Sequence, residues 1–180
     1  RHVQIQSVTD FSVPSEGYGQ FLVDVFHEWY AHDVGKVYVS QFDNLLGQWL
    51  GYPSTTCVHQ PTCGQSLVLE ANGEVYACDH FVYPEYKVGN LTQQPLTEIV
   101  LSNKQQQFSL EKSQKLTALC RHCEFRKLCY GGCPKHRFVS LENEPNPHNY
   151  LCASYRYFFE QTAPYMQAMA RQIRLHPSAA

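Results

Sequence analysis

Four cysteines lie in one short stretch of this chain, Cys120-Arg121-His122-Cys123-Glu124-Phe125-Arg126-Lys127-Leu128-Cys129-Tyr130-Gly131-Gly132-Cys133. Cys57, Cys63 and Cys78 lie upstream of it, and Cys152 lies downstream. The 8 cysteines make two sets of four, and soft thiolate sets select zinc or iron–sulfur clusters. The grouping of these cysteines is therefore the first question that the sequence raises.

A crowded run of four cysteines favours iron–sulfur clusters over a single metal ion. A structural zinc site usually uses two short knuckles about 12–20 residues apart. In two-cluster proteins the last cysteine of a run ligates the other cluster. If one member of the run serves the other site, Cys152 completes its set and both sets are balanced. Zinc and disulfide bonds remain open on residue types alone.

Composition argues against several other classes of function. The chain has 180 residues and a net charge of −2, without the basic surplus usual for nucleic-acid binders. No apolar run approaches the length of a membrane-spanning helix, and residues 1–6 do not resemble a signal peptide. Clustered cysteines without a secretion signal indicate a reducing compartment, so we expect a cytoplasmic protein with no nucleic-acid or membrane partner. Because no initiator Met is present, we expect the chain to begin in mid-protein.

The first 52 residues predict an alternation of strands and helices. Residues 2–8 and 37–40 are typical of strands. Apolar residues at helical spacing predict a helix between them and a second helix over residues 42–50. The apolar stripe of the first helix, all expected to pack into a core, is Tyr18, Phe21, Leu22, Val25, Phe26, Trp29 and Tyr30. This unit is too short to close a sheet alone, so we expect the end of a larger barrel or sheet.

From residue 53 onward the sequence predicts a different organisation. Asn72-Gly73 lies between two strand-like segments and predicts a β-hairpin with a type I′ turn. A weak helix is predicted over residues 92–112. A terminal helix follows Cys152, with Pro164 as a break or a new first turn. The expected fold class is α+β, with a β-hairpin, cysteine-rich loops and packed helices.

The cysteine pattern resembles the seven-cysteine signature of SPASM domains. It runs Cys63-x9-Gly73-x4-Cys78, then Cys120-x2-Cys123-x5-Cys129-x3-Cys133, then Cys152. SPASM domains are C-terminal extensions of radical S-adenosylmethionine enzymes that hold auxiliary [4Fe-4S] clusters. The additional Cys57 and the strings over residues 75–82, 87–90 and 130–135 are similar to those of anaerobic sulfatase-maturating enzymes.

The resemblance implies two domains and two [4Fe-4S] clusters. Residues 1–52 would be the C-terminal remnant of a radical S-adenosylmethionine (β/α) barrel, and residues 53–180 would be the SPASM domain. The ligands of the first cluster would be Cys57, Cys63, Cys78 and Cys133. The ligands of the second cluster would be Cys120, Cys123, Cys129 and Cys152. With four cysteines on each cluster, no iron would remain open to substrate, and a preparation made in air could hold zinc instead.

The resemblance also implies a reaction, the oxidation of a Cys or Ser of a sulfatase polypeptide to Cα-formylglycine. A 5′-deoxyadenosyl radical removes a hydrogen from the target Cβ, the thiol or hydroxyl loses a proton, and one electron leaves. Asp79, directly after the third cysteine of the first cluster, would be the general base if a dry pocket raises its pKa. A turn-capping role is the alternative for Asp79. The expected polar or charge-balancing neighbours of the clusters are His80, His122, Lys135, His136 and Arg137.

One departure from the family pattern bears on activity. No C-x3-C-x2-C motif occurs in the chain, so S-adenosylmethionine and a third [4Fe-4S] cluster would belong to a missing N-terminal part, and the chain alone would be inactive. We expect a sulfatase polypeptide and the missing barrel as partners. Two alternatives remain open: a SPASM domain of another peptide-modifying radical enzyme, and a zinc-binding structural or regulatory module. The sequence does not decide between a Cys and a Ser target.

Overall fold

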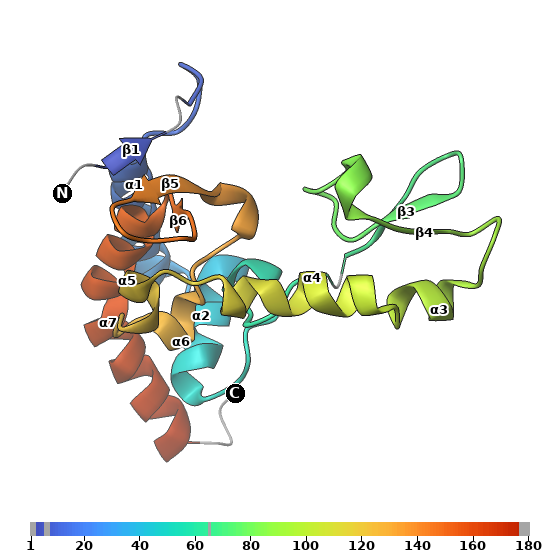
Figure 1. Ribbon diagram of the computed structural model, residues 1–180. Coiled ribbons are helices and arrows are strands. Elements are labelled where there is room, and N and C mark those ends of the chain that lie inside the picture. The colour runs from blue at the N-terminus through green and yellow to red at the C-terminus, as the bar shows by residue number, and fades with distance from the viewer. Residues whose placement is uncertain (1–2, 6–7, 65, 177–180) are drawn as a thin grey trace.

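The computed structural model describes residues 3–5, 8–64 and 66–176 (Figure 1). The α-helices are α1 (Ser15–His32), α2 (Ser40–Leu50), α3 (Leu96–Val100), α4 (Asn103–Gln114), α5 (Ala118–Arg121), α6 (Arg126–Cys129) and α7 (Cys152–Leu175). The strands are β1 (Val3–Ile5), β2 (Val68–Leu69), β3 (Glu74–Tyr76), β4 (Lys87–Asn90), β5 (Arg137–Leu141) and β6 (His148–Asn149). Single turns of 3₁₀ helix are η1 (Cys57–His59), η2 (Pro84–Tyr86) and η3 (Pro134–His136). This combination of small antiparallel sheets and helices is the α+β class that the sequence predicts.

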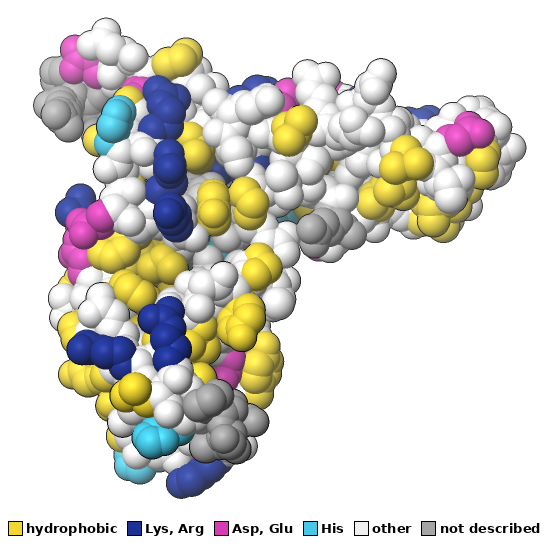
Figure 2. Space-filling model, turned by 90° about the horizontal axis from the view of Figure 1, so that it is seen from below, with side chains coloured by type: hydrophobic (Ala, Val, Ile, Leu, Met, Phe, Trp, Pro, Cys, Tyr) yellow, Lys and Arg dark blue, Asp and Glu magenta, His cyan; other side chains and the backbone are white. Residues whose placement is uncertain are grey.

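These elements form a body and a projecting arm (Figure 1). The body holds α1, α2, α5, α6, α7 and the sheet β1-β5-β6, whereas the arm holds the sheet β2-β3-β4 with α3. Helix α4 runs between the two. Figure 2 shows the same projection from below, with Lys and Arg side chains gathered along the body beside hydrophobic ones. Within the described residues, no helix is long and apolar enough to cross a membrane.

An aromatic core joins α1, α2 and α7. Phe26 and Phe158 are fully buried, and their ring centroids lie 6.3 Å apart in an edge-to-face arrangement. Helices α1 and α7 approach closely at Gly19, where a Cβ would come within 2.9 Å of the Ser154 Cα. The first 52 residues therefore share their core with the C-terminal helix.

The predicted apolar stripe of α1 is only partly buried. Phe21 is 59% exposed, and Val25 and Tyr30 are exposed as well. The expectation that the whole stripe packs into the core is therefore wrong for these three residues. One helix covers only a limited arc of its neighbour, and α7 lies against the side of α1 that carries Gly19 and Leu22.

The strand predicted over residues 37–40 is wrong. The Val37 carbonyl accepts a hydrogen bond from Trp29 Nε1 at 2.9 Å, and the Val39 N–H donates to Asp43 Oδ2 at 2.7 Å. These backbone groups serve the two flanking helices, so the segment is the N-terminal cap of α2. The strand predicted over residues 2–8 is present as β1, which pairs antiparallel with β5, while residues 2, 6 and 7 lie outside the described residues.

The β-hairpin of the arm is confirmed, but its turn is of another type. A type I′ turn needs positive φ at both central residues, and here Gly73 has a φ of 83° while Asn72 is not in that region. The Gly73 N–H donates to the Glu70 carbonyl and the Glu70 N–H donates to the Glu74 carbonyl, both at 2.9 Å. The Asn72 side chain accepts from the Glu74 N–H at 3.1 Å. This is a three-residue turn in which glycine supplies the single left-handed position.

Two helix predictions also change in detail. The weak helix over residues 92–112 is two helices, α3 and α4, because the Ser102 hydroxyl caps α4 by accepting from the Gln105 N–H at 3.2 Å. Helix α7 continues through Pro164 without a break. Pro164 is exposed, and the helix continues past it although its ring removes the N–H that would bond the Glu160 carbonyl.

Candidate metal centres

Four of the cysteines surround one cavity in the body. The cavity has a volume of about 490 Å³, and its cysteine lining is Cys120, Cys123, Cys129 and Cys152. They come from α5, the turn that follows it, the end of α6 and the first residue of α7. All four are half-buried and none is in a disulfide bond. The structure thus brings together the four residues that the family resemblance groups as the second ligand set.

The thiols of this second set influence one another electrostatically. Burial first, and then charge on Cys120, Cys129 and Cys123, raise the pKa of the Cys152 thiol to about 12. Burial also raises the pKa of the Cys129 thiol to about 11, while the Gly131 N–H lowers it in part. The Cys129 and Cys152 thiols therefore stay protonated unless a cation compensates them, and a bound metal deprotonates its thiol ligands outright. The donor set and the size of the cavity fit a metal cluster.

The remaining four cysteines form a second neighbourhood, between the arm and the body. Burial raises the pKa of the Cys63 thiol, and charge on Cys133 and Cys57 adds to this. Burial likewise raises the pKa of Cys133, with a contribution from Cys57. The pKa of Cys78 rises to about 12 through burial first, and Cys63 is among the further causes. Cys133 therefore faces the upstream cysteines, although it lies next to Cys129 in sequence.

A tight turn takes Cys133 away from its sequence neighbours. Tyr130, Gly131 and Gly132, the glycine turn, have φ of 47°, 73° and 62° in succession. A Cβ on Gly131 would come within 2.5 Å of Leu116 Cδ2. A Cβ on Gly132 would come within 2.4 Å of an Asn149 nitrogen. Only glycine allows this path at these two positions.

Asp79 lies at the edge of the first set. Its Oδ1 is 3.1 Å from Cys78 Sγ and 3.1 Å from the His80 N–H. The hydrogen bond from Cys78 lowers the pKa of the Asp79 carboxyl, and His80 adds to this. The side chain is 61% exposed. The dry pocket that would raise its pKa is not formed around Asp79 by the described residues.

The family assignment follows from comparison with known proteins. The model of the SPASM family, an iron–sulfur cluster-binding domain, matches residues 57–124. This chain carries a SPASM domain. The match covers five of the eight cysteines, from Cys57 to Cys123.

Similarity to whole proteins extends beyond the SPASM domain. The serine-type anaerobic sulfatase-maturating enzyme of Bacteroides thetaiotaomicron is 43% identical over 168 residues, which cover 93% of this chain and 40% of that protein. The cysteine-type enzyme of Clostridium perfringens strain 13 is 33% identical over 92% of this chain and 45% of that protein. A solved structure of anSMEcpe with bound AdoMet and the Kp18Cys peptide superposes with a TM-score of 0.80 at 32% identity, over 94% of this chain and 47% of that one. The chain therefore spans less than half the length of these relatives.

The histidines near the SPASM cysteines fall into two groups. His80 Nδ1 lies 3.6 Å from Cys133 Sγ, and His148 Nδ1 lies 3.7 Å from Cys120 Sγ. His122 instead bonds the carbonyl of Ala118 in its own helix. His148 was not singled out from the sequence, because no local pattern links it to Cys120 across the intervening residues. Among the described residues, no group of three or more His, Cys, Asp or Glu side chains is closed around a single-ion site.

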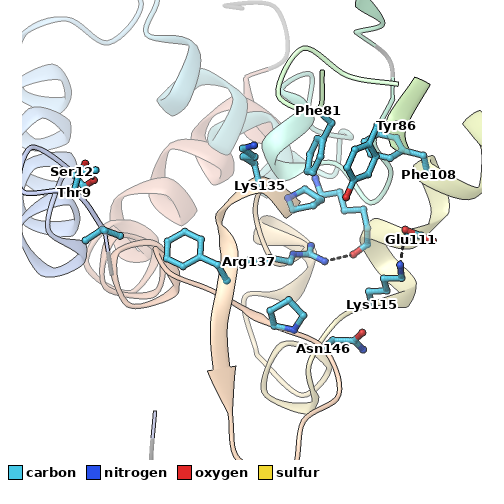
Figure 3. Close-up of a pocket in the computed structure, with 15 residues that line it drawn as sticks. Thr9, Ser12, Phe81, Tyr86, Phe108, Glu111, Lys115, Lys135, Arg137 and Asn146 are labelled. Atoms are coloured by element: carbon cyan, nitrogen blue, oxygen red, sulfur yellow. Dashed lines mark hydrogen bonds and ion pairs between the residues drawn. The ribbon is translucent and has the colours of Figure 1, made fainter. Parts of the chain in front are cut away.

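A separate cavity of about 740 Å³ lies beside the first cysteine set (Figure 3). Lysine, arginine and aromatic side chains line much of it. Lys115 pairs with Glu111 at 2.7 Å, and Lys135 bonds the Tyr83 hydroxyl at 2.6 Å. Arg137 points toward the backbone of α4. Lys115, Lys135 and Arg137 therefore already have partners within this chain.

Proposed function

We propose that this chain is the auxiliary-cluster part of an anaerobic sulfatase-maturating enzyme. The observation that carries the proposal is a cavity lined by four cysteine thiols within a chain that is 43% identical to such an enzyme. A SPASM domain acting on another peptide is the first alternative, and a zinc-binding structural or regulatory module is the second. The size of the cavity and the pairing of two four-cysteine sets favour clusters over single ions.

The proposed ligand sets are those that the family resemblance implies. Cys57, Cys63, Cys78 and Cys133 would hold one [4Fe-4S] cluster. Cys120, Cys123, Cys129 and Cys152 would hold the other. The mutual effects of these thiols on their pKa values support this division, because charge on the other members raises the pKa within each set. When bound, the clusters would supply an electron sink for the oxidation.

Asp79 is the proposed general base for the target thiol or hydroxyl. Its carboxylate is exposed and follows Cys78 directly, so a peptide bound at this edge could reach both the base and the first cluster. The peptide and the remainder of the enzyme would have to exclude water from it. The target itself would be a Cys or a Ser of a sulfatase polypeptide.

Residues 1–52 are proposed as the part that adjoins a radical S-adenosylmethionine barrel. Three large aromatic side chains of this segment are exposed: Phe11 is 92% exposed, Tyr38 is 71% exposed and Phe21 is 59% exposed. A barrel outside this chain would cover them and would hold S-adenosylmethionine and a third [4Fe-4S] cluster. Such oxygen-sensitive, thiolate-rich sites suit a reducing compartment such as the cytoplasm.

The test uses the longer enzyme that includes this chain, purified without oxygen. It is given S-adenosylmethionine, a reductant and a sulfatase-derived peptide with either Ser or Cys at the target position. Mass spectrometry should show the formylglycine aldehyde with at least one of the two peptides. If the enzyme cleaves S-adenosylmethionine but forms aldehyde with neither peptide, the sulfatase proposal is wrong and another peptide substrate is indicated.

The proposal that Asp79 is the general base is tested separately, by comparing two variants. Asp79→Asn should abolish most aldehyde formation while hydrogen removal from the target continues. Glu85→Gln, a change of another exposed acid on η2, is the matched control and should leave turnover unchanged. Normal turnover in Asp79→Asn would show that Asp79 is not the base.

A further inference from the structure

Lys112 is a buried lysine with no acidic partner in the part of the chain that the structure describes. It lies in α4 and is 1% exposed, and its Nζ donates to the carbonyls of Cys57 at 2.5 Å and Val58 at 3.1 Å. Lysine is almost never fully buried unless it is paired. Among the described residues, the ion pairs between lysine and a carboxylate involve Lys87 and Lys115 and leave Lys112 out. These two carbonyls accept from two of its three N–H groups but do not cancel its charge.

Arg137 is a second inward-facing cation, at the start of β5. Its guanidinium donates to the carbonyls of Lys112 at 2.7 Å, Tyr130 at 2.9 Å, Gly131 at 3.2 Å and Gly132 at 3.3 Å. Figure 3 shows this side chain reaching across to the backbone of α4. No carboxylate pairs with Arg137 in the part of the chain that the structure describes. Arg137 thus holds the carbonyls of the glycine turn, which separates the two cysteine sets.

The cysteine sulfurs would supply negative charge to these cations once they bind metal. Lys112 interacts with Cys63, Cys57 and Cys133, all members of the first set. Arg137 interacts with Cys120 and Cys129 of the second set and with Cys63 and Cys133 of the first. The sulfurs carry charge when they ligate metal. The charges of the buried Lys112 and the half-buried Arg137 would therefore be compensated only in the metal-loaded protein.

We propose that Lys112 and Arg137 set the reduction potentials of the two cysteine-ligated centres, with Lys112 acting on the first centre and Arg137, which lies between them, acting on both. The inference rests on the proposed function, because it needs both centres to be loaded with iron–sulfur clusters. Net charge near a cluster and solvent exposure both tune its potential. A buried positive charge stabilises the more negative, reduced state, so removing it makes the cluster harder to reduce.

The test is a potentiometric titration of this chain loaded without oxygen, followed by electron paramagnetic resonance. Cys57→Ala and Cys152→Ala assign the signals of the first and second centres. Lys112→Met should move the potential of the first centre to more negative values and leave the second nearly unchanged. Arg137→Gln should move both potentials in the negative direction. Arg137→Lys keeps the charge and should restore both potentials toward wild type, even if it lowers thermal stability.

The control variants distinguish the effect of a buried charge on the cluster potential from the effect of an exposed charge close to the cluster. Lys135→Gln removes an exposed cation two residues from Cys133, and solvent screening should keep its effect well below that of Lys112→Met. Iron and sulfide counts on each variant show that the clusters are loaded. If Lys112→Met does not take up iron–sulfur clusters, the comparison of Arg137→Gln with Arg137→Lys tests the inference alone.

Two results would overturn the inference. One is loaded clusters with wild-type potentials in Lys112→Met and Arg137→Gln. The other is a shift in Lys135→Gln as large as that in Lys112→Met. A wild-type chain without iron and sulfide would instead count against the proposed function itself, so the two failures are distinguishable.

Discussion

Cys133 separates from its sequence neighbours in space, and this is the residue-scale feature that the two-centre account depends on. We predict that Cys133→Ala loses about half the iron by emptying the first centre and leaves the second centre loaded. The double variant Cys57→Ala/Cys133→Ala should lose no more than Cys133→Ala alone, because both changes affect the same centre. Iron and sulfide counts with electron paramagnetic resonance check both statements.

The matched control is Cys129→Ala, which removes a cysteine of the same sequence block. It should empty the second centre, and Cys129→Ala/Cys133→Ala should lose nearly all the iron. If Cys133→Ala and Cys129→Ala affect the same signal, the division of the cysteines between the two centres is wrong.

Gly132 makes the separation of Cys133 possible, because its φ of 62° lies in the left-handed region that glycine adopts without steric cost. Gly132→Ala should cost about 1–3 kcal/mol for the left-handed backbone, with a further cost for the contact with Asn149. Thermal unfolding under anaerobic conditions measures the change. Gly47→Ala in α2 is the control, since a Cβ there meets nothing within 4 Å, and it should be neutral or stabilising by about 0.5–1 kcal/mol. An equal loss of stability in both variants would contradict the argument from the glycine turn.

At this scale the sequence predicts the cysteines and some of their neighbours, such as His80 and Arg137, but not the buried Lys112. The eight thiols and the Gly131-Gly132 pair stand out by residue type and spacing. Lys112 does not, because a lysine in a polar helix is usually solvated. Its burial depends on the loop of Cys57 folding over α4, which is a contact between segments far apart in the chain.

At the scale of single helices and strands, Pro164 in α7 offers the clearest test of how the sequence affects stability. It lies inside α7 on the exposed side, where it removes one helical hydrogen bond. Pro164→Ala should restore that bond and stabilise the protein by up to about 3 kcal/mol. Gln167→Ala, one turn later and also exposed, should change stability little, and chemical denaturation compares the two. A loss of stability in Pro164→Ala would show that the ring makes a contact or bend that the fold needs.

Helices and strands are predicted correctly where the local sequence pattern determines them. They are predicted wrongly where contacts with another segment determine the structure. Asn72-Gly73 predicts the hairpin, and the apolar spacing predicts α1 and α2. The segment at residues 37–40 has strand-like residues but pairs with none of the described strands, and its backbone groups bond to Trp29 and Asp43 instead. The exposed side of α1 could not be predicted, since it depends on where α7 lies.

At the scale of the whole molecule, the first cysteine set connects the arm to the body. Cys78 follows the central strand of the arm, whereas Cys57 and Cys133 lie at η1 and η3. Loading the first centre should therefore slow amide hydrogen exchange in β3 and β4, since a metal would tie the arm in place. Cys57→Ala should lose this protection, and Cys152→Ala, which affects only the second centre, should keep it. Equal protection in both variants would contradict the connecting role.

The central claim is that the eight cysteines hold two iron–sulfur clusters, and the most direct measurement is an iron, sulfide and zinc count on the chain purified without oxygen. The account predicts about eight iron and about eight sulfide per chain, with four of each lost when one set is broken. One or two zinc ions per chain without sulfide would contradict it. That result would favour a structural zinc module and leave the electron-sink role without support.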